Sequence, residues 1–256
     1  MVAIGPGVRV DVTRLIHSFE LQRENLRVLD GIDLSVRPGG FVAILGPSGC
    51  GKSTLLRLIA GLDRPCSGHI LVGGQQIEAP HPSRILVFQD PTLYPWRTVR
   101  QNVALGLEAR GLLKKQYTRI DDVLRLVGLE CFGDAYPHQL SGGMAQRAAL
   151  ARALVNEPSV LLMDEPLANL DSLTRMAMQA ELLELWQHEQ FTAFLITHDV
   201  EEALCLAERV LVLSHRPARI VADIALDLPY PRHRACARFT ERRQNVMEVL
   251  GLNMQW

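Results

Sequence analysis

The sequence predicts an α/β fold in which a mostly parallel sheet is joined to an N-terminal antiparallel β subdomain and an inserted helical subdomain. The first observation is a series of short, continuously apolar runs, typical of strands buried on both faces of a parallel sheet. Helical patterns separate most of these runs, so strand and helix alternate along the chain. The predicted strands cover residues 41–45, 85–88, 160–163, 193–197 and 210–213, and the predicted helices cover residues 52–60, 172–189 and 201–208.

Two regions depart from this alternation. Apolar and polar residues alternate singly at 8–12 and 32–36, which indicates antiparallel strands with one solvated face. Between Asp90 and Glu157 no run is typical of a strand, and helical patterns fill the interval. These helices are predicted at residues 99–109, 119–127 and 144–155.

The domain organisation follows from these patterns. We expect a single domain over residues 1–256, with a helical subdomain at about 90–157 and a short C-terminal tail at about 225–256. A closing helix with a charged face is expected at 238–250. We find no internal repeat that would indicate a different architecture.

The composition is that of an ordinary globular protein. Of 256 residues, 48% are hydrophobic and 21% are charged, and the formal net charge is −1. No basic face is indicated, so we expect no nucleic-acid partner. The five cysteines form no CxxC pair, which indicates reduced thiols rather than a zinc site or a disulfide framework. No run of about 18 apolar residues occurs, so we expect any membrane channel to belong to another chain.

A phosphate-binding loop follows the strand predicted at 41–45. The sequence GPSGCGKST satisfies the pattern G-x-x-x-x-G-K-[ST] and leads into a predicted helix. Glycines let the backbone turn so that successive N–H groups converge on phosphate oxygens, at the positive end of a helix dipole. Lys52 is expected to reach the β- and γ-phosphates, and the Ser53 hydroxyl is expected to ligate Mg²⁺. The motif therefore predicts a P-loop NTPase core, and a reagent that modifies Cys50 is expected to block ATP. The predicted ATP-binding residues of the loop are Gly46, Pro47, Ser48, Gly49, Cys50, Gly51, Lys52, Ser53 and Thr54.

Two carboxylates end the strand predicted at 160–163. Asp164 and Glu165 are expected at the carboxyl edge of the sheet, where open α/β sheets bind ligands. Asp164 suits an ATP-bound Mg²⁺, directly or through water, and Glu165 suits a general base that polarises the attacking water. A carboxylate pair alone also fits a solvated turn, but the phosphate loop favours the catalytic interpretation. Both elements together still fit many nucleotide-binding proteins, including small-molecule kinases.

A third motif separates these alternatives, because a P-loop kinase should lack it. Leu140–Met144 (LSGGM) closely resembles the signature sequence of ABC transporter ATPases, and other family markers stand in the family's order between about residues 8 and 250. Gln89 resembles the Q-loop glutamine, His198 the switch histidine, and Phe19 the aromatic residue that stacks on adenine. The residues that resemble the D-loop are Ala168, Asn169, Leu170 and Asp171. The residues that resemble the signature are Leu140, Ser141, Gly142, Gly143 and Met144, the last in place of the family's usual glutamine.

The resemblance implies a catalytic arrangement. The implied catalytic residues are Glu165, His198 and Gln89. The implied Mg²⁺ ligands are Ser53, Gln89 and Asp164. Hydroxyl and N–H donors gather where the helix after Ser141 begins, which makes a second anion site. In the family, the signature of one subunit closes on ATP held by the other, so a homodimer with two composite sites is expected.

The resemblance also implies partners and a location. These are two transmembrane permease subunits and a periplasmic or lipid-anchored solute-binding protein, with the chain at the cytoplasmic face of the inner membrane, held peripherally by the permease. Leu93–Trp96 (LYPW), Leu140–Arg147 (LSGGMAQR) and Leu226–Arg232 (LDLPYPR) resemble segments of importers for nitrate, sulfonates and taurine. Uptake of such a small solute is therefore expected. An ABC exporter subunit and a non-transport ABC ATPase acting on DNA or ribosomes stay open as alternatives.

Overall fold

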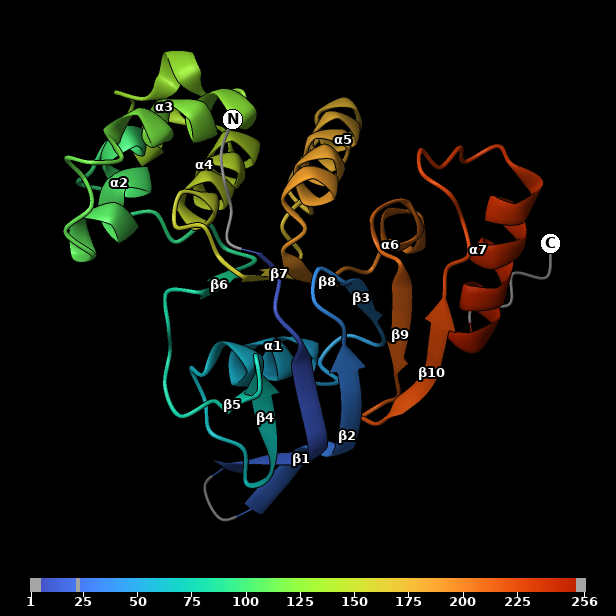
Figure 1. Ribbon diagram of the computed structural model, residues 1–256. Helices are drawn as coiled ribbons and strands as arrows, with labels where there is room; N and C mark the ends of the chain where they lie inside the picture. Colours follow the sequence, from blue (N-terminus) through green and yellow to red (C-terminus); the bar gives the residue numbers. More distant parts are fainter. Residues whose placement is uncertain (1–5, 22–23, 252–256) are drawn as a thin grey trace. The chain divides into compact units, whose positions relative to one another are not determined.

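The computed structural model describes residues 6–21 and 24–251 (Figure 1). The chain divides into two compact units. Unit 1 comprises residues 1–7 and 81–191, and unit 2 comprises residues 8–80 and 192–256. Each unit is described by itself.

The first sheet of unit 2 is antiparallel, with the strand order β2-β1-β4-β5. From Ile32 to Val36, buried and exposed side chains alternate residue by residue. The prediction of antiparallel strands with one solvated face is therefore confirmed for this sheet. Its strands are β1 (Val10–Leu21), β2 (Glu24–Val36), β4 (Ser67–Val72) and β5 (Gln75–Gln76).

The remaining four strands of unit 2 pair mostly in parallel. β3 pairs in parallel with β8 on one side and with β9 on the other, and β10 adds to β9 in the antiparallel sense. Every residue of β3 and β8 is buried, and α1 contacts β8 while α6 contacts β3. The strands are β3 (Phe41–Leu45), β8 (Thr192–Ile196), β9 (Arg209–Leu213) and β10 (Ile220–Ala225). The helices are α1 (Lys52–Ala60), α6 (Val200–Leu206) and α7 (Ala237–Val249).

Unit 1 combines a parallel strand pair, β6 and β7, with a group of helices in which α2 contacts both α3 and α4 (Figure 1). The whole segment from Asp90 to Glu157 is described, and it contains helices and turns without a strand, as the sequence predicts. The strands are β6 (Arg84–Val87) and β7 (Val160–Asp164). The helices are α2 (Val99–Ala109), α3 (Tyr117–Leu126), α4 (Gly142–Leu154) and α5 (Ser172–Glu189), with 3-10 turns at Glu130–Phe132 and Pro137–Gln139.

The predicted fold class is confirmed, with a few differences in detail. α4 begins two residues earlier than the apolar pattern indicates, because Ser141 caps it. β4, β5 and β10 are not among the predicted strands. Within the described ranges, no helix has the length and apolarity needed to cross a membrane.

A buried arginine ties α3 to the end of α4. Arg119 is 8% exposed, and its guanidinium donates to the carbonyl oxygens of Val155 at 2.8 Å and Leu154 at 3.2 Å. It also forms an ion pair with Glu157, and burial lowers the pKa of the guanidinium. The last carbonyls of a helix lack partners within that helix, so Arg119 supplies the donors that α4 needs.

We predict that Arg119→Met lowers the free energy of unfolding by about 2–3 kcal/mol, because buried acceptors lose their partner. Urea unfolding followed by circular dichroism measures this change. The matched control is Arg125→Met, on the same helix, whose side chain is 67% exposed and pairs with Asp122. We expect about 0.5 kcal/mol or less for the control, and equal effects of both substitutions would contradict the assignment.

Candidate active site

The predicted phosphate loop connects β3 to α1 in unit 2. Gly51 is the N-cap of α1, and no side chain of the described residues caps the helix there. The first N–H groups of α1 therefore point toward any anion at this end of the helix. Lys52 is 9% exposed, and its Nζ donates to the carbonyl oxygens of Gly46 at 2.8 Å and Pro47 at 2.9 Å. The ammonium group is thus held across the loop, where it can meet phosphate oxygens.

The loop requires glycine at two positions. Gly46 has a φ of 153° and Gly51 a φ of 122°, values that residues with a side chain rarely adopt. A Cβ at Gly51 would lie 2.6 Å from Val28 Cγ1 and 2.9 Å from Leu29 Cδ2. A Cβ at Gly46 would lie 2.9 Å from the Leu213 carbonyl oxygen. β2 and β9 therefore press on the loop and leave no room for a side chain.

His198 lies at the same edge of the parallel sheet as this loop. Ile44 of β3 is paired with Ile196 of β8, so Gly46 and His198 each follow a paired position by two residues. His198 is exposed, and the next residue, Asp199, caps α6 by accepting two N–H groups of its first turn at 2.8 and 3.2 Å. The connection between β8 and α6 is therefore short and hydrogen-bonded on its helix side.

Phe19 lies on β1, on the strand that pairs with β2. Its residue is 40% exposed, and its ring makes a T-shaped contact with His17 at 4.7 Å between centroids. His17 is paired with Leu29, one of the residues that border Gly51. An exposed aromatic ring two residues along the strand from this border suits a role in adenine stacking.

In unit 1, two of the three predicted catalytic residues, Gln89 and Glu165, meet at the ends of β6 and β7. Val87 is paired with Met163, so Gln89 and Glu165 each follow a paired position by two residues. Gln89 Nε2 donates to Glu165 Oε2 at 3.4 Å. Asp164 is the last residue of β7 and is half-buried. Glu165 has a φ of 47°, a strained conformation for glutamate that turns the chain out of the strand at the carboxylate.

The signature segment forms the start of α4. The Ser141 hydroxyl oxygen accepts the Met144 N–H at 3.2 Å, so its proton stays available for donation to an anion. Ser141 and Gly142 are exposed. A Cβ at Gly143 would lie 2.8 Å from Leu170 Cδ2, so the signature segment packs against the D-loop within unit 1.

The D-loop, Ala168–Asp171, leads into α5. Asp171 accepts the Thr174 N–H at 3.0 Å as the helix cap, and hydrogen bonds from Thr174 lower the pKa of this carboxyl. Arg175 Nη2 donates to two carbonyl oxygens of the loop, at 2.9 and 3.4 Å. Asn169 is exposed between these fixed points.

Two residues that the sequence reasoning missed fasten α4 to the segment after β6. Gln146 is 1% exposed, and its Nε2 donates to the Phe88 carbonyl at 3.2 Å. Arg152 donates to the carbonyls of Pro91–Thr92, both at 2.9 Å, and burial lowers its pKa. In the sequence, the only indication of a structural role is that both are polar residues within an alanine- and leucine-rich helix. Through these bonds the signature helix is tied to the loop that carries Gln89.

The structure revises the expectation for Cys50. Its residue is 2% exposed, and burial raises the pKa of its thiol. Because the thiolate is the reactive form, a buried thiol with a raised pKa reacts slowly. We therefore expect reagents to modify the exposed Cys66, Cys131 and Cys236 first.

Parallel strands, the loop entering α1 and the carboxylates ending β7 define a P-loop nucleoside triphosphatase. The sequence profile described as ABC transporter matches residues 29–168. The chain belongs to this family and is an ATP-binding, ATP-hydrolysing subunit of the ABC transporter class.

Several relatives match most of this chain. An uncharacterized ABC transporter ATP-binding protein of Methanocaldococcus jannaschii is 48% identical over 244 residues, 95% of this chain and 91% of that protein. The aliphatic sulfonates import ATP-binding protein SsuB of Bacillus cereus is 40% identical over 232 residues, 90% of this chain and 91% of that protein. The nitrate import ATP-binding protein NrtC of Synechococcus elongatus is 47% identical over 211 residues, 80% of this chain but 32% of that longer protein.

Solved structures of the ABC transporter cassette MJ0796 share the fold. A dimeric form has a TM-score of 0.78 and a dimeric post-hydrolysis form with ADP and Pi a TM-score of 0.77. Each is 30% identical to this chain and covers 85% of it and 98% of the cassette.

We predict that Gly51→Ala weakens ATP binding by about 30- to 100-fold, equivalent to about 2–3 kcal/mol of strain, because its Cβ would displace β2 or the loop. Titration with a fluorescent ATP analogue measures the affinity. The control is Gly74→Ala, since Gly74 also has a positive φ, 79°, but its Cβ would meet nothing within 4 Å. An affinity for Gly51→Ala within twofold of wild type would refute the steric account.

Proposed function

We propose that this chain is the ATP-hydrolysing subunit of an ABC importer that takes up nitrate, taurine, an alkanesulfonate or a related small solute. The observation that carries the proposal is its 39–47% identity, over 80–93% of its length, to ATP-binding proteins named for nitrate or aliphatic sulfonate import. In this proposal the two units form one ABC ATPase domain over residues 1–256, with a helical subdomain at about 90–157 and a tail at about 225–256.

The phosphate loop and Phe19 supply the ATP-binding part of the proposed site. The N–H groups of the loop and the Lys52 ammonium neutralise the phosphates, and the Phe19 ring stacks on adenine. Mg²⁺ would be held by Ser53, Gln89 and Asp164, whose hydroxyl, amide and carboxylate oxygens are the donors that this hard cation prefers. The bond from Gln89 Nε2 to Glu165 leaves Gln89 Oε1 free to face a cation. When bound, Mg²⁺ neutralises charge that develops on the phosphates.

Glu165 is the proposed general base. Its carboxylate accepts a proton from the water that attacks the γ-phosphate, a role worth about 10²–10⁴ in rate. Its contact with Gln89 ties the orientation of the carboxylate to the loop after β6. His198 donates a hydrogen bond to the γ-phosphate and keeps the water in line. All three residues follow paired strand positions by two residues, so strand pairing sets where they leave the sheet.

A second copy of the chain would complete each site. Ser141 and Gly143 place a hydroxyl and N–H groups at the positive end of α4, a geometry suited to the γ-phosphate of ATP held by the other copy. The dimeric structures of the related cassette MJ0796 support a homodimer. The packing of Gly143 against Leu170 links this contact to the D-loop.

The permease is proposed to dock beside Gln89. Tyr94 and Trp96 are 43% and 70% exposed, with ring centroids 5.2 Å apart. Asn102, fully buried, holds their loop by accepting the Tyr94 N–H at 2.8 Å and donating to the carbonyls of Tyr94 and Arg97 at 3.2 and 3.1 Å. An exposed aromatic pair on a fixed loop suits a protein interface. This docking would hold the chain at the cytoplasmic face of the membrane, with a solute-binding protein on the other side.

In the proposed cycle, ATP binding holds the two copies together in a closed dimer. Two copies bind two Mg-ATP, close head to tail and drive the permease outward-facing, and hydrolysis reopens the dimer. Energy enters because ATP binds the closed state more tightly than the open one. An exporter subunit or a non-transport ABC ATPase is the alternative, and the proteins captured with the chain distinguish them.

We predict that Glu165→Gln lowers kcat by at least about 10²-fold, because the amide cannot accept the proton of the attacking water. The same variant should dimerise when ATP is added, as measured by size-exclusion chromatography with light scattering. Glu184→Gln, at an exposed position of α5, is the control and should hydrolyse ATP like wild type. Hydrolysis by Glu165→Gln at the wild-type rate would show that Glu165 is not the general base. A Glu165→Gln chain that stays monomeric in ATP would contradict the proposed homodimer.

We predict that Trp96→Ala lowers recovery of a multispanning permease by about tenfold, since central aromatic residues dominate many interfaces. The measurement is affinity capture of the tagged chain from detergent-solubilised membranes, followed by mass spectrometry. Val221→Ala, 55% exposed on β10, is the control for loss of an exposed apolar side chain. Equal permease recovery with both variants would place the docking surface elsewhere, and capture of ribosomal proteins would favour the non-transport alternative.

A further inference from the structure

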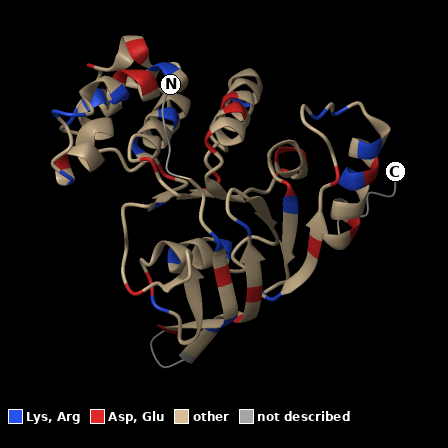
Figure 2. Ribbon diagram, viewed as in Figure 1, with Lys and Arg blue, Asp and Glu red and all other residues tan. Residues whose placement is uncertain are grey.

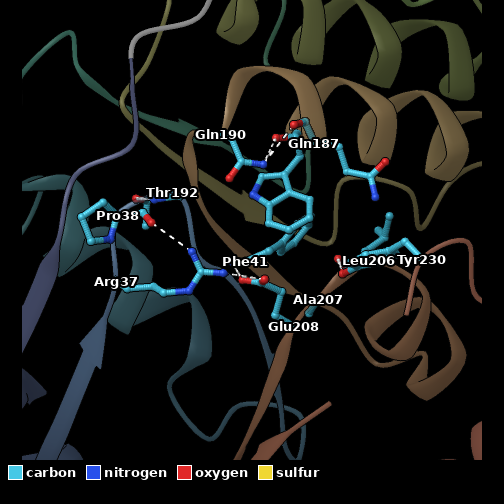
Figure 3. A network of polar contacts seen from close by, with 12 residues as sticks. Arg37, Pro38, Phe41, Gln187, Gln190, Thr192, Leu206, Ala207, Glu208 and Tyr230 are labelled. Atoms are coloured by element: carbon cyan, nitrogen blue, oxygen red, sulfur yellow. Dashed lines mark hydrogen bonds and ion pairs between the residues drawn. The ribbon is translucent and has the colours of Figure 1, made fainter. Parts of the chain in front are cut away.

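The segment that follows β10 contacts both ends of α6, the helix that begins just after His198. At the C-terminal end of α6, Arg232 Nη1 donates to the carbonyl oxygens of Leu204 and Ala207, both at 2.5 Å. The Tyr230 hydroxyl donates to the Leu206 carbonyl at 2.8 Å, and Figure 3 shows the two residues side by side. These carbonyls lie where a helix leaves its acceptors unpaired, and a cation there is favoured by the helix dipole.

Arg232 and Tyr230 also hold each other. The Arg232 guanidinium carbon lies 4.1 Å from the Tyr230 ring centroid, and Arg232 Nε donates to the Leu228 carbonyl at 3.1 Å. Burial raises the pKa of Tyr230 to about 12, so the hydroxyl keeps its proton at neutral pH. The planar guanidinium thus has a fixed orientation, with acceptors on α6 and a ring beneath it.

α7 secures the other end of α6. Glu201, in the first turn of α6, accepts from Arg243 of α7 at 2.8 Å and forms an ion pair with Arg234 at 3.7 Å. Figure 2 shows basic residues on α7 and on the segment before it. α7 is itself anchored by Phe239 and Val246, which are 2% and 0% exposed. The C-terminal segment therefore contacts the first and the last turn of α6.

His198 lies in the short connection between β8 and α6. β8 ends at Ile196 and α6 begins at Val200, so few residues separate a buried strand from the clamped helix. Thr197 is 2% exposed, and its Oγ1 accepts the Asp199 N–H at 3.0 Å. Since Asp199 caps α6, a shift of α6 displaces the backbone at His198.

We propose that Arg232 and Tyr230 are positioning residues for ATP hydrolysis, which act through α6 to hold His198 in place. The inference rests on the proposed function, because it assumes that His198 contacts the γ-phosphate. The residues touch neither the phosphate loop nor Lys52 in the contacts described above, so they should affect the rate of the chemical step and leave ATP affinity unchanged. A role in general stability would instead change both together.

The test compares Arg232→Ala, Tyr230→Phe and the control Arg238→Ala, an exposed arginine at the start of α7, in the full chain. We expect Arg232→Ala to lower kcat about tenfold, since displacing a catalytic group by ~1 Å costs up to ~10²-fold. ATP affinity should stay within twofold, and hydrogen exchange should rise in residues 197–206 but not in α1. Tyr230→Phe keeps the ring and removes one hydrogen bond, so we expect a loss of about threefold, and it serves if Arg232→Ala does not fold.

The inference is overturned if exchange in residues 197–206 rises while kcat is unchanged, if kcat falls without that rise, or if ATP affinity falls together with kcat. Wild type and His198→Ala are measured alongside to separate the two levels of the proposal. No hydrolysis by wild type would refute the proposed function itself, and a wild-type rate with His198→Ala would refute the role of His198 on which the inference rests. A large loss with His198→Ala and none with Arg232→Ala or Tyr230→Phe would refute only the positioning role.

Discussion

The turn from β3 into α1 is the constraint on which the phosphate site depends. β3 is buried along its whole length between β8 and β9. The chain therefore leaves the sheet only where β3 ends, at the start of the phosphate loop. It leaves through Gly46 and Gly51, where β9 and β2 already occupy the space that a side chain would need. The N–H groups of α1 consequently face outward, and Lys52 lies across the loop. Binding of a polyphosphate therefore combines the backbone N–H groups of the loop with the Lys52 ammonium.

In each unit, parallel strand pairing then sets the positions of the proposed catalytic side chains. In unit 2 the pairing of Ile44 with Ile196 sets His198 at the edge where the loop begins. In unit 1 the pairing of β6 with β7 sets Gln89 beside Glu165, whose positive φ directs the carboxylate out of the strand. β3, β7 and β8 are almost entirely buried and cannot slip without exposing apolar surface, so the positions of Glu165 and His198 are well defined. Polar side chains such as Arg152 and Arg232 then fix the loops and helices that continue from the strands.

Much of this arrangement could be predicted from the sequence, because the motifs are local and the core strands are continuously apolar. The bounds of β3, α1, α2 and α5 match the predicted ranges. β4 and β10 were missed because their residues are mostly half-exposed or exposed, and neither carries more than three consecutive apolar residues. Gln146, Arg152 and Arg119 could not be assigned, because each gains its role from carbonyls far away in sequence. The burial of Cys50 likewise depends on packing that the motif does not encode.

The central claim is that ATP held by the loop of one copy meets the signature segment of another. Mixed dimers test it directly, formed from unlabelled Glu165→Gln chains and ¹⁵N-labelled Lys52→Ala chains that lack the phosphate-binding ammonium. An ATP analogue with a photoreactive group on its γ-phosphate is added, and the cross-linked peptide that contains Ser141 is identified by mass spectrometry. The account predicts that this peptide carries ¹⁵N, because it comes from the chain that does not hold the nucleotide. Cross-links confined to the unlabelled peptide would contradict it.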